Sequence, residues 1–152
     1  MSEQMNTIQI NESIIPSSLK FLIVEDVQHV RETMIEYLKE MGFKGEIKYT
    51  DSSDRAFKLA SEEKFDFFIL DWSLKEGTGQ EILAKLRSNP EYSLTPMLMV
   101  TGHDSIEDMM LAMESGASAY LIKPWTWEEL EIKLCEAWNF HLKSRLKVTE
   151  LI

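Results

Sequence analysis

Four short apolar runs, separated by segments with helical spacing, constrain the fold of this chain more than any other feature. The runs are Phe21-Leu22-Ile23-Val24, Phe67-Phe68-Ile69-Leu70, Met97-Leu98-Met99-Val100 and Tyr120-Leu121-Ile122, with a weaker one around residues 47–49. Runs of this length suit strands that are covered on both faces, as in a parallel sheet. Periodicity alone leaves buried helical segments open, so the intervening segments decide between the two.

Those segments carry apolar residues at intervals of three and four. The stripes cover residues 27–41, 56–60, 82–86, 106–113 and 127–138. Gly42 and Gly116 follow two of them as helix stops, and Thr126 with Glu129 forms a capping box before the last. Asp104 with Glu107 predicts a similar start for the fourth helix. Five alternations of strand and helix predict an α/β fold, an open parallel sheet with helices on both faces.

Length and charge set the limits of the chain's organisation. Its 152 residues suit one domain, and a net charge of -10 disfavours binding to nucleic acid. No apolar stretch is long enough to span a bilayer, and the single cysteine, Cys135, permits a reducing compartment, so we expect a cytoplasmic protein. We expect a flexible leader over residues 1–18, a domain over 19–143, and a helix end or tail over 144–152.

Polar or charged side chains follow each strong apolar run. Glu25 and Asp26 follow the first run, Asp71 the second, Thr101 the third and Lys123 the fourth. Because the carboxyl ends of parallel strands lie on one edge of a sheet, these groups should converge. Taken singly, each has an ordinary explanation, such as Asp26 capping a helix. Their coincidence at four strand ends favours a common site.

The chemistry of that site follows from its residue types. Three carboxylates brought together repel one another unless a cation neutralises them. Ligands that are all oxygen favour a hard ion such as Mg²⁺. Lys123 adds a positive charge and Thr101 a hydroxyl donor, so the group could stabilise a phosphoryl group in transfer.

At this point the chain resembles the receiver domains of two-component response regulators, in the single-domain chemotaxis style. The resemblance covers about residues 19–140, and it is carried by FLIVEDV (21–27), FFILDWS (67–73), MLMVTG (97–102) and SGASAYLIKPWT (115–126). It implies a flavodoxin-like (βα)5 fold with strand order 2-1-3-4-5. It also implies that the protein is a signalling switch, with no catalysis beyond its own phosphorylation and dephosphorylation.

The resemblance assigns roles residue by residue. Asp71 would accept the phosphoryl group from the phosphohistidine of a sensor histidine kinase or a histidine phosphotransfer protein. Asp26 and Asp71 would bind Mg²⁺ directly, Glu25 through water, and Ser73 through its backbone carbonyl. Lys123 would pair with the acceptor carboxylate and then with the phosphoryl oxygens.

The resemblance also implies how the signal leaves the site. Thr101 would swing toward the phosphoryl group, and Tyr120 would rotate inward as the aromatic switch. The Lys123–Pro124 peptide would be cis. A downstream protein would bind the face formed by the fourth helix, the fifth strand and the fifth helix, with Trp125 and Trp127 nearby. The chain would be a monomer or a weak dimer.

Three departures from the family pattern stand out. The usual Asp-Asp pair is Glu25-Asp26, Leu74-Lys75 replaces the usual Met-Pro, and the glycines of the loop 76–79 favour flexibility. His103, two residues after Thr101, is expected to be exposed to solvent and without a role.

Four other functions remain to be weighed. A haloacid-dehalogenase-type phosphatase needs a second aspartate where Ser73 stands. An FMN-binding flavodoxin needs a phosphate cradle that the loop after the first strand lacks. A pseudo-receiver that docks without phosphorylation, and a receiver fragment of a larger regulator, both stay open.

Overall fold

The computed structural model describes residues 6–142 and Ser144. A central sheet contains β3 (Phe21–Val24), β4 (Ile47–Thr50), β5 (Phe67–Asp71), β6 (Met97–Thr101) and β7 (Ala119–Ile122). All four strand pairings are parallel, and the order is β4-β3-β5-β6-β7. When the five strands of this sheet are numbered in chain order, the order is 2-1-3-4-5, so the predicted flavodoxin-like topology is confirmed. Every residue of β3, β5 and β6 is buried, which explains their unbroken apolar sequences.

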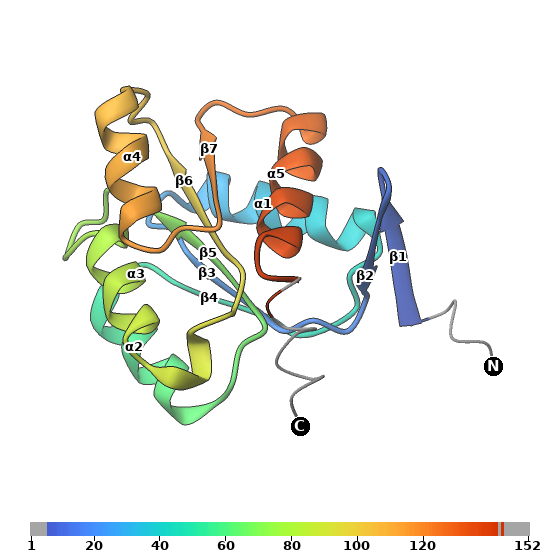
Figure 1. Cartoon of the computed structure of the whole chain (residues 1–152), viewed down its shortest axis with the longest axis horizontal. Coiled ribbons are helices and arrows are strands. Elements are labelled where there is room, and N and C mark those ends of the chain that lie inside the picture. The colour runs from blue at the N-terminus through green and yellow to red at the C-terminus, as the bar shows by residue number, and fades with distance from the viewer. Residues whose placement is uncertain (1–5, 143, 145–152) are drawn as a thin grey trace.

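Five helices cover the two faces of the sheet, as Figure 1 shows. On one face lie α1 (Gln28–Met41) and α5 (Trp127–Phe140), whose apolar side chains share a core with Phe21 and Ile23. On the other lie α2 (Ser53–Glu62), α3 (Gly79–Arg87) and α4 (Ile106–Glu114), whose buried side chains share a second core with Leu22 and Val24. The alternation of side chains along one strand therefore supplies both cores. A short 3₁₀ helix, η2 (Pro90–Tyr92), follows α3.

The helix ends test several sequence predictions. The capping box of Thr126 and Glu129 is confirmed at the start of α5. The prediction that Asp104 caps the fourth helix is wrong, because the side chain of Ser105 accepts the hydrogen bond from the Asp108 amide. Asp26 is not a cap either, since α1 begins after Val27 without a side-chain cap.

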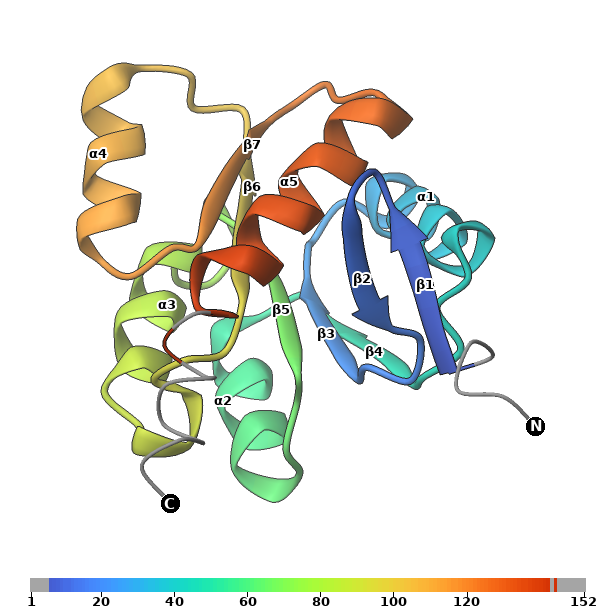
Figure 2. The same ribbon diagram turned by 45° about the vertical axis from the view of Figure 1, so that its right-hand side comes forward.

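The N-terminal segment differs from the flexible leader expected for residues 1–18. Strands β1 (Thr7–Ile10) and β2 (Ser13–Pro16) form an antiparallel hairpin, with Asn11 in the turn at φ 55°. Figure 2 shows this hairpin beside α1 and α5.

Burial explains why the hairpin is ordered. Ile10 and Ile15 are buried in the core that α1 and α5 share. The carbonyl of Ile10 accepts a hydrogen bond from the Cys135 thiol, and Asn139 donates to the Ser13 hydroxyl. The apolar area that these isoleucines bury stabilises the hairpin, although most residues of the segment are polar.

The C-terminal residues and the helix lengths bear on two further predictions. The predicted helix end or tail over residues 144–152 lies outside the described residues except for Ser144, and the domain limits 19–143 stay a prediction. In the described part of the chain, no helix combines the length and apolarity needed to cross a membrane.

Candidate functional site

The polar residues that follow the strands meet at one edge of the sheet, as predicted. Asp71 and Thr101 end β5 and β6, Glu25 and Asp26 follow β3, and Lys123 follows β7. Asp26, Asp71 and Lys123 line a hollow of about 650 Å³, which we call the strand-end pocket. Its lining residues are Asp26, Val27, Asp71, Ser73, Gly102, His103, Asp104, Ser105, Asp108 and Lys123.

Three carboxylates form an acidic cluster at this edge of the sheet, and two of them, Asp26 and Asp71, line the pocket. One oxygen atom from each of Glu25, Asp26 and Asp71 lies within 4.8 Å of the others. Glu25 and Asp71 are buried, and Asp26 is partly exposed, so a bound ion would keep access to solvent. All of these ligand atoms are carboxylate oxygens, a donor set that fits a hard divalent cation. The residues therefore suit a metal of this class.

Lys123 is the cation of the cluster. Its ammonium nitrogen lies 2.7 Å from Oε1 of Glu25 and 3.3 Å from Oδ2 of Asp71. Burial lowers the pKa of Lys123, but Glu25 and Asp71 outweigh it and the pKa is raised. Burial and the Glu25 carboxylate raise the pKa of Asp71 to about 7, despite the Lys123 ammonium. One lysine thus offsets only part of the repulsion between the carboxylates.

Backbone contacts hold the loop that follows β5. The amide of Ser73 donates to Oδ1 of Asp71 at 3.4 Å, and Ser73 forms an isolated bridge with Thr78. A Cβ atom on Gly79 would lie 2.0 Å from the carbonyl oxygen of Asp71, so only glycine lets α3 begin this close. Gly77 adopts φ 81°, so each of the two glycines of this loop meets a backbone requirement of the turn. The expected metal contact through the Ser73 carbonyl stays a prediction.

Thr101 and Tyr120 are connected through the backbone of His103. The hydroxyl of Thr101, which is fully buried, accepts a hydrogen bond from the His103 amide at 3.1 Å. The hydroxyl of Tyr120 donates to the His103 carbonyl at 2.7 Å. Tyr120 therefore already lies inward in this structure, and burial raises its pKa to about 12.

The side chain of His103 makes contacts that the sequence did not predict. Its Nε2 lies 3.1 Å from the Ser73 hydroxyl, and its Nδ1 lies 3.2 Å from Oδ2 of Asp108 on α4. The ring of Trp72 lies against it, with centroids 5.4 Å apart. The imidazole is exposed to solvent, as expected, but it contacts Ser73, Asp108 and Trp72. The nearest signal in the sequence was its position two residues after Thr101.

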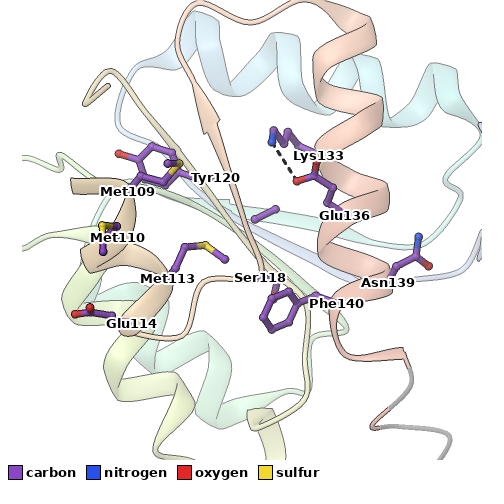
Figure 3. Close-up of a pocket in the computed structure, with 11 residues that line it drawn as sticks. Met109, Met110, Met113, Glu114, Ser118, Tyr120, Lys133, Glu136, Asn139 and Phe140 are labelled. Atoms are coloured by element: carbon purple, nitrogen blue, oxygen red, sulfur yellow. Dashed lines mark hydrogen bonds and ion pairs between the residues drawn. The ribbon is translucent and has the colours of Figure 1, made fainter. Parts of the chain in front are cut away.

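A second hollow, of about 660 Å³, lies between α4, β7 and α5 (Figure 3). We call it the methionine groove, because Met109, Met110 and Met113 line it together with Phe140 of α5. These four side chains are substantially exposed, which is unusual for large apolar residues.

Trp125 precedes α5 and Trp127 is the first residue of that helix. Their rings contact Tyr37 of α1, with centroid distances of 5.7 and 4.9 Å, and neither lines the methionine groove. The expectation that both lie near the predicted partner-binding face is therefore not supported by their contacts. The Lys123–Pro124 peptide beside them is cis, as the resemblance implies.

Comparison with known proteins agrees with this architecture. The model of the response regulator receiver domain matches residues 21–134. The chain is 29% identical over 123 residues to chemotaxis protein CheY-3 of Vibrio cholerae, covering 81% of this chain and 94% of the relative. It is 28% identical over 116 residues to chemotaxis protein CheY of Pseudomonas aeruginosa, covering 76% and 93%. The structure of chemotaxis protein CheY4 of Vibrio cholerae superposes with a TM-score of 0.72, at 28% identity, covering 79% of this chain and 98% of that one.

Proposed function

This chain belongs to the response regulator receiver family, and from that premise we propose that Asp71 accepts a phosphoryl group with Mg²⁺ bound beside it. The single observation that carries the proposal is the cluster that Glu25, Asp26, Asp71 and Lys123 form at one edge of the sheet. As a receiver domain, the chain takes part in two-component signal transduction.

Asp71 is the nucleophile of the proposed reaction. A carboxylate oxygen of Asp71 attacks the phosphorus of a phosphohistidine, and the phosphorus–nitrogen bond breaks with its electron pair returning to the imidazole. Lys123 lies within reach of Asp71 and would stabilise the negative charge on the phosphoryl oxygens. We propose a sensor histidine kinase or a histidine phosphotransfer protein as the donor.

Glu25, Asp26 and Asp71 would hold the metal ion, with the Ser73 carbonyl as a further ligand. Bound Mg²⁺ would supply the positive charge that lets three carboxylates and a phosphoryl group occupy one pocket. The replacement of the usual aspartate by Glu25 keeps the charge of that position. Its oxygen pairs with Lys123 in this structure, so metal binding must compete with that ion pair.

Phosphorylation would reach the surface through Thr101 and Tyr120. The hydroxyl of Thr101 would exchange its hydrogen bond from the His103 amide for one to a phosphoryl oxygen. Tyr120 hydrogen-bonds the same residue and lines the methionine groove. We propose this groove, on the face of α4, β7 and α5, as the binding site of a downstream protein.

Intact-mass measurement after incubation with acetyl phosphate tests the proposal. One added phosphoryl group that requires both Mg²⁺ and Asp71 is the expected result, with Asp71→Asn and a chelator as controls. No addition under any condition would contradict the proposal and favour a pseudo-receiver that docks without phosphorylation.

A second measurement tests the route to the groove. In a sample with ¹³C-labelled methionine methyl groups, phosphorylation should shift the signals of Met109, Met110 and Met113. Met34 of α1 lies in the opposite core and serves as the matched control. Equal shifts at Met34 and at the groove would contradict a specific route through Tyr120.

A further inference from the structure

The turn between β3 and α1 carries two of the three carboxylates of the acidic cluster. Glu25 and Asp26 lie in this turn, and α1 begins after Val27 without a side-chain cap. The carboxylate of Asp26 forms no hydrogen bond or ion pair within the described part of the chain, whereas Glu25 and Asp71 both contact Lys123. The direction of the Asp26 side chain is therefore set by the backbone of the turn.

Arg31 of α1 holds that backbone. Its Nη1 donates a hydrogen bond to the carbonyl oxygen of Glu25 at 3.1 Å. This carbonyl belongs to the peptide plane that joins Glu25 to Asp26, so its orientation also fixes the direction in which the chain enters Asp26. The other polar groups of Glu25 have separate partners, since its amide donates to Thr50 and its carboxylate accepts from Val27. Among the described residues, Arg31 is the only side chain that hydrogen-bonds the peptide group between Glu25 and Asp26.

Tyr49 of β4 contacts the guanidinium of Arg31 as well. The guanidinium carbon lies 4.5 Å from the centroid of the Tyr49 ring, which is a cation–π contact. Nε of Arg31 is buried and has no hydrogen-bond partner among the described residues, which costs free energy. The contacts with the Glu25 carbonyl and the Tyr49 ring offset this cost, and together they give the guanidinium one position.

The charge of Arg31 acts against a cation at this cluster. The guanidinium pairs with no carboxylate of the described residues, so its positive charge is not neutralised by a close partner. A positive charge near the cluster repels a divalent cation and by itself weakens its binding. A correctly directed Asp26 carboxylate strengthens that binding. The two effects of Arg31 therefore have opposite signs, and the affinity for the ion tells which is larger.

We propose that Arg31 is a positioning residue for the divalent cation, acting through the Glu25–Asp26 peptide group and the Asp26 carboxylate. The inference rests on the proposed binding of Mg²⁺ at the acidic cluster. Mg²⁺ demands near-ideal octahedral geometry, whereas Ca²⁺ accepts a range of ligand numbers and directions. A turn that is held in place favours Mg²⁺ over Ca²⁺, so Arg31 contributes to the choice of ion as well as to its affinity.

Titrations with Mg²⁺ and with Ca²⁺, followed by the fluorescence of Trp72, test the inference. Trp72 follows Asp71 directly and is almost fully buried. Arg31→Met removes the guanidinium and keeps an unbranched stem, so the Kd for Mg²⁺ should rise about three- to tenfold, the range for one lost hydrogen bond. The Kd for Ca²⁺ should rise less, because this ion tolerates a displaced ligand. Arg55→Met, at an exposed position of α2, is the matched control for the loss of one positive charge and should raise neither Kd.

Two further variants separate positioning from a purely structural role. Arg31→Lys keeps the charge and a donor but lacks the planar group that stacks on Tyr49, so its two Kd values should change in the same sense by smaller factors. This variant also keeps the test valid if Arg31→Met fails to fold. Tyr49→Leu should add no further change to Arg31→Met, because the two side chains act as one unit. A general loss of structure would instead weaken the binding of both ions equally.

The outcomes distinguish this inference from the proposed function. An unchanged or lower Kd for Mg²⁺ in both Arg31 variants would overturn the inference and leave the Mg²⁺-dependent phosphorylation of Asp71 intact. An equal rise for Mg²⁺ and Ca²⁺ would assign the effect to the local fold and would also overturn it. If the wild type binds no Mg²⁺, the proposed metal site fails, and this inference fails with it.

Discussion

The ammonium nitrogen of Lys123 lies 3.3 Å from Oδ2 of Asp71, the carboxylate that we propose to be phosphorylated. The same nitrogen lies 2.7 Å from Glu25, so one cation bridges two buried carboxylates. Lys123 therefore holds the acceptor in place before a phosphoryl group arrives, and it is available to the phosphoryl oxygens afterwards.

Replacing Lys123 by methionine should slow phosphorylation by at least about tenfold, because the charge that stabilises the phosphoryl oxygens is lost. The rate of mass gain with acetyl phosphate at fixed Mg²⁺ measures this. Lys133→Met is the matched control, since Lys133 pairs with Glu136 on α5, away from the strand-end pocket. Equal rates for the two variants would remove Lys123 from the mechanism.

Replacing Asp26 by asparagine should weaken Mg²⁺ binding by about tenfold or more, because a charged oxygen ligand is lost. The fluorescence of Trp72, which follows Asp71 directly and is nearly buried, offers a readout for the titration. Trp72→Phe should abolish the fluorescence change, which would assign that change to Trp72. Asp54→Asn in the first turn of α2 is the control for loss of one negative charge. If Asp54→Asn weakens binding as much, the effect is one of net charge.

The stability of the metal-free protein should depend on the protonation of Asp71. Its pKa is raised to about 7 in the folded protein from an ordinary value of 3.8, so the folded state binds the proton more tightly than the unfolded state. This contribution to stability is fully present below about pH 4 and is lost as the pH rises through about 7. Urea unfolding in chelator at pH 5 and pH 8 measures it.

Asp71→Asn should reduce that difference between pH 5 and pH 8, because the amide does not titrate. An unchanged difference in the variant would assign the pH dependence to other groups. With saturating Mg²⁺, the loss of wild-type stability at pH 8 should be offset, because the ion binds the deprotonated cluster of the folded state.

The N-terminal hairpin should contribute measurably to stability. Ile15→Ala removes a fully buried side chain and should lower the free energy of unfolding by about 2–4 kcal/mol. Its neighbour Ile14 is 66% exposed, and Ile14→Ala should change the free energy by no more than about 0.5 kcal/mol. Chemical unfolding of both variants provides the comparison. Equal effects would mean that β2 is not packed in solution as it is in the structure.

The sequence predicted the sheet and the acidic pocket because both depend on local patterns. Short apolar runs predict buried strands, and the parallel arrangement brings Asp71 and Lys123 to one edge. Neither prediction requires the identity of distant contacts. The strand order followed from the family resemblance, and β4-β3-β5-β6-β7 confirms it.

The hairpin was missed although its signals are present. Isoleucines alternate with polar residues along β1, and Asn11 occupies the turn. The polar composition of residues 1–18 obscures this alternation. A two-stranded hairpin is only marginally stable by itself, so its order depends on the core it shares with Leu38 and Cys135. That dependence is a tertiary contact, which local patterns do not encode.

The contacts of His103 and the two tryptophans could not be predicted for a similar reason. Asp108 contacts His103 because α4 begins at Ile106, after the Ser105 cap, rather than after Asp104. Trp127 packs on Tyr37 because of the rotation of α5 about its axis, which a stripe of apolar residues defines only coarsely.

The position of Cys135 beneath the hairpin gives the protein an internal chemical reporter. Its thiol is buried, it donates to the carbonyl of Ile10, and burial raises its pKa, so it should resist alkylation while β1 and β2 are docked. It is also the only cysteine in the chain. The labelling rate of the native protein, divided by the rate in urea, therefore measures how often the hairpin detaches. Measuring that ratio with and without a phosphoryl group would show whether phosphorylation of Asp71 changes how often the hairpin detaches from α5. The measurement needs no foreign probe.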